Sequence, residues 1–237
     1  MDPFVDDRLR EAGVDLASYE GVLEWSTQYA ADRTEACREL SGGWRAVAYR
    51  LLSCAEHSQA FTRSIESAGD SPPFPERYVQ ERELFGFFVN GLAAIESLCY
   101  ALYAIGSLLR PELFARPPRA INLKSTLTAL RGAFPENTIG AILEGVAEDA
   151  RYREWKTLRD ILAHRVAPTR EFFVHIGREA QPPAQWRVSH DARLLLDGDT
   201  TSSRLHWLTT TLNGLLKATA ELVAAPPGAA QVIGTAT

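Results

Sequence analysis

The stretch from Phe85 to Leu109 constrains the fold of this chain more than any other part of its sequence. It is apolar over nearly its whole length, contains no proline and carries Glu96 as its only charged side chain. A run of that length exceeds ordinary strands and predicts a helix that is apolar nearly all round. We expect the central helix of a bundle here rather than a membrane span, because a mid-span carboxylate is costly in lipid.

The other helices are predicted from apolar residues at helical spacing and from the prolines and glycines that interrupt them. Ser41-Gly42-Gly43 predicts a break between two N-terminal helices, and the three prolines between residues 72 and 75 exclude a helix there. Asn122 is typical of a helix N-cap. The predicted helices span about 19–29, 44–68, 76–109, 122–130, 135–146, 149–165 and 201–224.

Two short runs rich in β-branched and aromatic residues interrupt the helical pattern. Glu171–Ile176 and Gln185–Val188 flank the sequence Gln181-Pro182-Pro183, and together they predict a small exposed hairpin before the last long helix. Helices with a single β excursion are typical of an all-α protein and not of an α/β sheet. The predicted fold class is therefore an all-α helical bundle with a small β-hairpin excursion.

The proline-rich loop near residue 70 also sets the expected organisation of the chain. Residues 1–70 are expected to form an N-terminal helical extension packed on the bundle, and residues 76–225 are expected to form the bundle itself. Residues 226–237, which are rich in proline, glycine and alanine, are expected to be a disordered tail.

Charge, cysteine content and the N-terminal residues together predict a cytoplasmic protein. Cys37, Cys54 and Cys99 form no close pair and lie in apolar helical patterns, which is typical of buried, reduced thiols. The first residues lack the basic and apolar regions of a secretory signal. A formal net charge of −5 argues against a protein that coats nucleic acid non-specifically. We expect no cofactor and no bound metal.

One basic stretch differs from this acidic background. Residues 151–170 hold six arginine or lysine residues and two acidic residues, a local balance of +4. One face of the predicted helix is apolar and should pack against the core; it comprises Trp155, Leu158, Ile161 and Leu162. The cations expected to assist RNA binding by general electrostatic attraction are Arg153, Lys156 and Arg165.

Arg159 and His164 supply the two functions that RNA cleavage without a metal requires. One group must exchange a proton with the 2′-hydroxyl or the leaving 5′-oxygen, and histidine titrates nearest to neutral pH. A fixed cation must also bind the phosphate oxygens, which arginine does as a bidentate fork. Asp160 lies one helical turn before His164 and could orient the imidazole. The same two side chains could share a metal, but no third ligand is evident.

Helical geometry separates the two proposed catalytic groups. Five residues at about 100° each place Arg159 and His164 about 140° apart around the helix. One helix therefore cannot hold both tightly on one phosphate, and a site completed by a second copy of the chain points to a homodimer. Alternatively, Arg159 could pair with Glu154 or Asp160 on a solvated face, and His164 could be a cation near a helix C-terminus. Arg170 and His175 repeat the spacing within a strand-like run, which we interpret as coincidence.

The segment from Arg159 to His164 resembles a motif of the HEPN family. A polar residue follows the arginine at once, and the histidine lies five positions after the arginine, near the end of a helix. The apolar block Phe87–Leu98 is similar to the long upstream helix of these proteins, and the resemblance covers residues 76–225. It implies a compact, dimeric helical bundle. It further implies a metal-independent endoribonuclease of a toxin–antitoxin, CRISPR-associated or antiviral system, with an antitoxin or the product of a neighbouring gene as a possible partner.

Carried over by position, the resemblance makes Arg159 and His164 the catalytic pair and Asp160 a polar modulator, where asparagine is the commoner residue. Other members of the family have lost catalysis and only bind. The alternative hypothesis is therefore a non-catalytic module that binds a nucleotide, RNA or a protein partner through the same basic stretch. A third hypothesis is a helical scaffold in which the motif is accidental.

Overall fold

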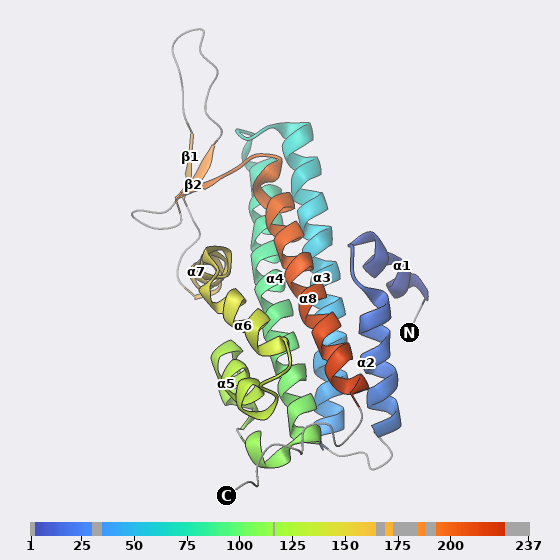
Figure 1. Cartoon of the computed structure of the whole chain (residues 1–237). Coiled ribbons are helices and arrows are strands. Elements are labelled where there is room, and N and C mark those ends of the chain that lie inside the picture. The colour runs from blue at the N-terminus through green and yellow to red at the C-terminus, as the bar shows by residue number, and fades with distance from the viewer. Residues whose placement is uncertain are drawn as a thin grey trace, which may run out of the picture. The chain divides into compact units, whose positions relative to one another are not determined.

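The computed structural model describes residues 3–29, 35–115, 117–164, 169–172, 184–187 and 193–225. Over these residues the chain is an all-α helical bundle with a small antiparallel sheet before the last long helix (Figure 1). The α-helices are α1 (Pro3–Glu11), α2 (Leu16–Tyr29), α3 (Glu35–Ala68), α4 (Phe74–Leu109), α5 (Leu123–Ala133), α6 (Ile139–Glu148), α7 (Ala150–His164) and α8 (Asp199–Ala224). Two 3-10 helices, η2 (Pro111–Leu113) and η3 (Pro118–Ala120), lie between α4 and α5. The fold class predicted from the sequence is confirmed.

The break predicted at residues 41–43 is wrong, because α3 continues through both glycines. An added Cβ at Gly43 would lie 3.2 Å from the ring of Tyr100 and 3.3 Å from Ala101, both in α4. The glycine therefore lets α4 approach α3 closely. That packing offsets the cost of a helical glycine, which is about 1 kcal/mol relative to alanine.

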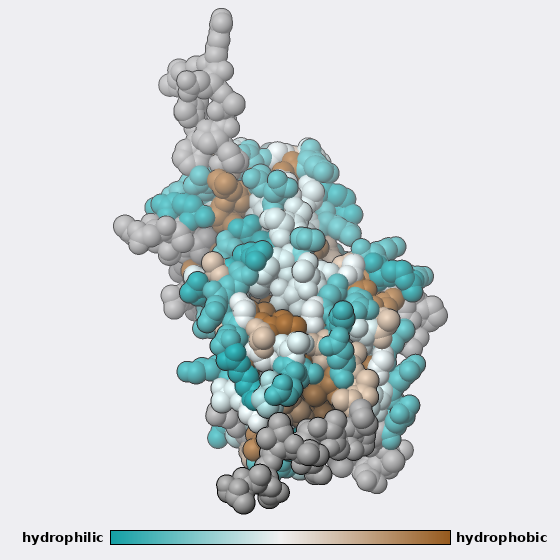
Figure 2. Space-filling model, viewed as in Figure 1, coloured by the Kyte–Doolittle hydropathy of each residue, from teal (hydrophilic) through white to brown (hydrophobic). Residues whose placement is uncertain are grey.

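Among the described residues, α4 is the one helix that is long and apolar enough to span a membrane by length and composition. However, 61% of its most apolar window is buried inside the protein. A mostly buried apolar helix is typical of a protein core, which agrees with the central helix expected from the sequence. On the face shown in Figure 2, hydrophilic residues predominate and apolar residues gather in small patches.

The chain divides into two compact units, each built from segments that are distant in sequence. The first unit comprises Met1–Tyr49, Ala94–Asp149 and Thr209–Thr237. In it, Tyr19 stacks on Trp44, and the Trp44 indole donates a hydrogen bond of 3.0 Å to the Tyr19 carbonyl. The predicted cap is present as well, because Asn122 and Ser125 form a reciprocal capping box at the start of α5.

The second unit comprises Arg50–Ala93 and Ala150–Leu208, and it contains α7, the sheet and parts of α3, α4 and α8. Ser58 of α3 donates a 2.8 Å hydrogen bond to Thr201 of α8. The division predicted from sequence, into residues 1–70 and 76–225, stays a prediction. The predicted tail lies outside the described residues.

The β excursion has one strand more than the predicted hairpin. Strands β1 (Thr169–Glu171), β2 (Gln185–Arg187) and β3 (Arg193–Leu195) pair in that order, all antiparallel. The middle residue of each strand is buried, which gives one inward row across the sheet: Arg170, Trp186 and Leu194. Residues 173–176 and 188 of the predicted strands lie outside the described residues.

Polar contacts fix the sheet to the turn between α3 and α4, so one face of it is not exposed. Arg170 donates a 2.7 Å hydrogen bond to Gln80, a fully buried side chain of α4. Gln80 in turn donates to the carbonyls of Ser64 and Gly69, where α3 ends. The backbone N–H of Ala184 donates to Asp70 in the same turn at 2.7 Å.

Candidate functional site

Helix α7, which carries the Arg-x4-His motif, is seated on an aromatic cluster. The Trp155 side chain is fully buried, with its ring centroid 5.0 Å from that of Phe87, 5.7 Å from that of Phe88 and 6.2 Å from that of Trp207. Leu158 and Ile161 are buried on the same side of the helix, and Leu162 is half-buried. The apolar face predicted for this helix is thus confirmed, and it fixes which side of α7 is polar.

Gly91 makes the seating of Trp155 possible. A Cβ placed on Gly91 would lie only 1.5 Å from Cζ3 of the Trp155 ring, which is far inside van der Waals contact. The indole therefore rests directly on the backbone of α4, and no larger residue at position 91 is compatible with this geometry.

Arg159 and Asp160 form an ion pair with each other. Nη1 of Arg159 lies 3.3 Å from Oδ1 of Asp160, and 23% and 37% of the two side chains are exposed. This is one of the alternatives left open by the sequence. The Glu154 carboxylate accepts hydrogen bonds of 2.7 Å and 3.1 Å from Arg204 of α8. A phosphate would have to share the Arg159 guanidinium with its neighbouring carboxylate.

The other basic residues of the stretch differ in role. Arg151 lies over the ring of Trp207, with Cζ 5.5 Å from its centroid, so it covers the aromatic cluster. Arg170 is buried in β1 and bonded to Gln80, so the second Arg-x4-His spacing begins in a strand, while His175 lies outside the described residues. Arg153 and Lys156 are exposed on α7, and their contact with RNA stays a prediction. Arg165 lies outside the described residues.

His164 is the last residue of α7, and its side chain lies outside the described part of the chain. The backbone is helical from Ala150 through His164, so the spacing assumed for Arg159, Asp160 and His164 holds along the helix. Asp160 is one turn before His164 on that helix. The convergence of the proposed catalytic side chains stays a prediction.

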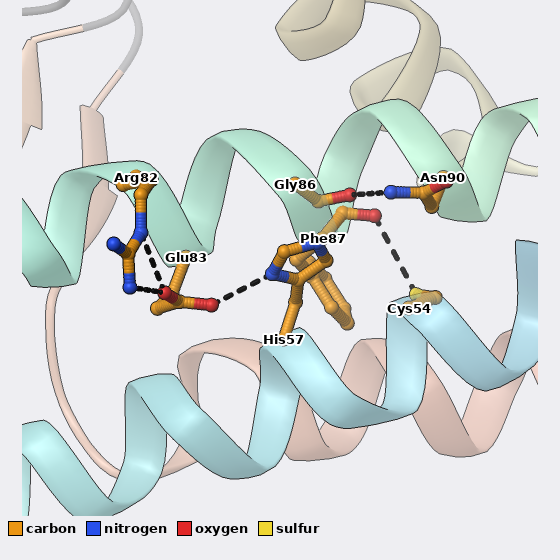
Figure 3. A network of polar contacts seen from close by, with 7 residues as sticks. All are labelled: Cys54, His57, Arg82, Glu83, Gly86, Phe87 and Asn90. Atoms are coloured by element: carbon orange, nitrogen blue, oxygen red, sulfur yellow. Dashed lines mark hydrogen bonds and ion pairs between the residues drawn. The ribbon is translucent and has the colours of Figure 1, made fainter.

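A second polar cluster, between α3 and α4, was not predicted from the sequence (Figure 3). His57 Nδ1 of α3 lies 2.7 Å from Oε2 of Glu83 in α4, and the other Glu83 oxygen accepts a 2.8 Å hydrogen bond from Nε of Arg82. The Glu83 side chain is 7% exposed and that of His57 is 29% exposed. His57 and Glu83 are far apart in sequence and on different helices, so no local pattern could have paired them.

The His57 ring is also closed off on its other side. A Cβ added to Gly86 would lie 2.3 Å from His57 Nε2, so that edge of the imidazole rests against the backbone of α4. Because one ring nitrogen bonds Glu83 and the other faces Gly86, the ring bridges the two helices. This geometry favours a structural role over proton transfer to a substrate.

The pKa of Glu83 gives this cluster a measurable signature. Burial raises that pKa, but hydrogen bonds from His57 and Arg82 outweigh it, and the pKa lies below its usual value. A carboxyl group with a lower pKa in the folded state stabilises the fold above its unfolded pKa. That stabilisation is lost as the pH falls through the folded pKa.

We expect Glu83→Gln to lower the free energy of unfolding at pH 7 by about 1.5–3 kcal/mol, the usual range for hydrogen bonds to a charged group. The difference from the wild type should narrow below about pH 4.3, the ordinary glutamate pKa. Urea denaturation at pH 7 and below about pH 4.3 measures this difference in the free energy of unfolding. Glu24→Gln, which removes an exposed glutamate, is the control. A difference independent of pH would contradict the assignment.

The described residues offer no obvious metal site and no reactive thiol. No group of three or more histidine, cysteine, aspartate or glutamate side chains is placed to hold a metal within the described ranges. Cys37, Cys54 and Cys99 are buried and unbridged, as predicted. Burial raises the pKa of Cys99 to about 12, so it stays protonated at neutral pH.

Comparisons with known proteins do not assign the chain to a family. No family model, no curated protein and no solved structure matches it. The resemblance to HEPN proteins therefore depends on the Arg-x4-His motif and its helical setting.

Proposed function

We propose that this chain is a metal-independent endoribonuclease of HEPN type that acts through α7. The main support is the way α7 is held. Its apolar face is fixed to the cluster around Trp155, while Arg153 and Lys156 are exposed and Arg159 and Asp160 are partly exposed. A rigid helix with an outward row of cations suits the binding of a phosphate backbone.

The proposed reaction needs no metal. A general base, for which His164 is the candidate, takes the proton of the RNA 2′-hydroxyl, and the 2′-oxygen attacks the adjacent phosphorus. The new 2′-oxygen–phosphorus bond forms as the bond to the 5′-oxygen breaks. The leaving 5′-oxygen takes up a proton from a general acid. Arg159 stabilises the negative charge on the non-bridging oxygens. Asp160 orients the imidazole of His164. The products are a 2′,3′-cyclic phosphate and a 5′-hydroxyl.

Two further proposals accompany this one. Because Arg159 and His164 are about 140° apart on one helix, the active species would be a homodimer in which each chain completes the other's site. A cytoplasmic toxin or defence component, restrained by an antitoxin or the product of a neighbouring gene, is the setting that the family resemblance implies.

Purified protein incubated with end-labelled RNA in EDTA should generate fragments ending in 2′,3′-cyclic phosphate. The matched control is DNA of the same sequence, which lacks the 2′-hydroxyl nucleophile and should remain intact. Equal cleavage of the DNA, or dependence on added divalent metal, would contradict the proposed mechanism. RNA that stays intact at every protein concentration would leave only the binding function described next.

The second candidate function is RNA binding without cleavage, and the Arg159–Asp160 ion pair favours it, since the guanidinium already has a carboxylate partner. Here Arg153→Gln with Lys156→Gln should weaken binding to single-stranded RNA. It should also reduce the slope of log affinity against log salt by about 1.4, because two phosphates are no longer neutralised. Titration by fluorescence anisotropy measures both. Arg45→Gln with Arg63→Gln, which removes two exposed arginines of α3, should change neither the affinity nor the slope.

A further inference from the structure

Arg170 of β1 is a buried cation with few polar partners. Its side chain is 2% exposed, and burial lowers the pKa of its guanidinium from the ordinary value. Nη2 donates a 2.7 Å hydrogen bond to Oε1 of Gln80. Among the described residues Nε and Nη1 have no hydrogen-bond partner, and the Glu81 carboxylate lies 4.0 Å from Nη1. Burying a cation with so little compensation costs stability, so the fold gains something other than stability from this residue.

The contact between Arg170 and Gln80 has one fixed direction. Gln80 is fully buried in α4, and its Nε2 donates to the carbonyl oxygens of Ser64 at 3.2 Å and Gly69 at 2.9 Å. Because both amide hydrogens are used in this way, Oε1 is turned toward Arg170. Hydrogen bonds are directional, whereas apolar packing is not and tolerates small shifts. The pair of Arg170 and Gln80, which we call the polar lock, therefore sets where β1 lies relative to α4.

The polar lock lies a short distance along the chain from the end of α7. Strand β1 begins at Thr169, five residues after His164, so the two Cα atoms lie within about 18 Å of each other. Helix α4 also holds α7 itself, through the contact of Trp155 with Gly91. Gln80 and Gly91 are eleven residues apart in α4, or about 16.5 Å along its axis. The same helix therefore supports the chain both before and after His164.

We propose that the polar lock positions His164 for the reaction proposed for α7, which makes Arg170 a positioning residue. The inference rests on the proposed ribonuclease function. The last turn of α7 is only partly packed, because Ile161 is buried, Leu162 is half-buried and Ala163 is exposed. A strand that is fixed just beyond the helix end limits the movement of this turn. The restraint matters for catalysis, since a shift of about 1 Å at a reacting group can cost about 100-fold in rate.

The test replaces both partners of the polar lock by apolar side chains, Arg170→Met with Gln80→Leu. Replacing both members of a buried polar pair is often neutral for stability or stabilising, whereas removing one leaves the other unsatisfied. We therefore expect the urea midpoint of the double variant to equal or exceed that of the wild type. Single-turnover cleavage of labelled RNA should slow by about 10-fold or more. The affinity for RNA should stay unchanged, because the exposed cations of α7 are still present.

Amide hydrogen exchange, followed by mass spectrometry, gives a second measurement that does not require cleavage. The peptide over residues 158–164 should exchange faster in the double variant than in the wild type, by about 5-fold or more, although global stability is kept. The matched control is Ser58→Ala with Thr201→Val, which removes a buried 2.8 Å hydrogen bond between α3 and α8. That control should change neither the cleavage rate nor the exchange of this peptide.

Arg170→Lys is the second variant, and it decides the question if the double variant does not fold. It keeps the charge but replaces the guanidinium fork by a compact ammonium group, so cleavage should slow and exchange should quicken in the same directions. Wild-type cleavage or wild-type exchange in a folded variant would overturn the proposal. If the wild type leaves RNA intact, the ribonuclease function is wrong and exchange alone decides. Faster exchange would then support the restraint of this helix end by the polar lock, and unchanged exchange would refute it.

Discussion

Gly91→Ala is expected to destabilise the protein by at least about 3 kcal/mol, at or above the upper end of the usual cost of overpacking. The new methyl group would lie 1.5 Å from the Trp155 ring. The ring cannot withdraw, because Phe87, Phe88 and Trp207 surround it. Either α7 must move away from α4 or the indole must leave its site. Urea denaturation followed by circular dichroism measures the loss.

Gly145→Ala is the matched control for this substitution. Gly145 lies within α6 with no atom within 4 Å of an added Cβ. Replacing it removes conformational freedom from the unfolded chain and should stabilise the protein by about 0.4–1 kcal/mol. The two alanines should therefore shift the midpoint of unfolding in opposite directions. Equal effects would mean that α7 is not held by contact between Trp155 and Gly91.

His164→Ala is expected to lower the rate of RNA cleavage by about 100-fold or more, the usual contribution of a general acid–base group. His164 is the last residue of α7, and alanine is the best helix former, so the substitution should keep that helix end formed. Single-turnover cleavage of a labelled RNA, together with a thermal melt of each variant, separates loss of chemistry from loss of fold.

His175→Ala provides the control for this experiment. His175 follows Arg170 at the same spacing as His164 follows Arg159, but Arg170 belongs to a strand and is buried. Its replacement should leave cleavage at the wild-type rate. If His164→Ala cleaves as fast as the wild type, or if both variants lose activity together, the assignment of the catalytic histidine is wrong.

Much of the fold could be predicted from the sequence because its signals are local. Apolar spacing and prolines placed α4 to within two residues of its observed start and at its observed end. Asn122 caps α5 as expected, through a contact only three residues away. Likewise, the apolar face of α7 follows from the helical spacing of Trp155, Leu158 and Ile161. Each of these features depends on residues within a few turns of one another.

The errors and omissions involve contacts between distant segments. Gly42 and Gly43 resemble a helix end, yet α3 continues because Gly43 permits close packing on α4. Strand β3 is three residues long and is defined by its pairing with β2, not by a pattern of its own. Arg204 pairs with Glu154 from another helix, and His57 pairs with Glu83 from another helix.

The sequence by itself determined the helical class, most helix ends and the position of the basic helix, because periodicity, proline and capping act over a few residues. Only the tertiary structure decided that Arg151 of that helix lies over the ring of Trp207, since the two residues meet across a long sequence separation. The tertiary structure also decided that the side chains of Phe74, Tyr78 and Phe85 are exposed on α4. Burial is a property of the assembled fold, and no local pattern of residues specifies what another segment will cover.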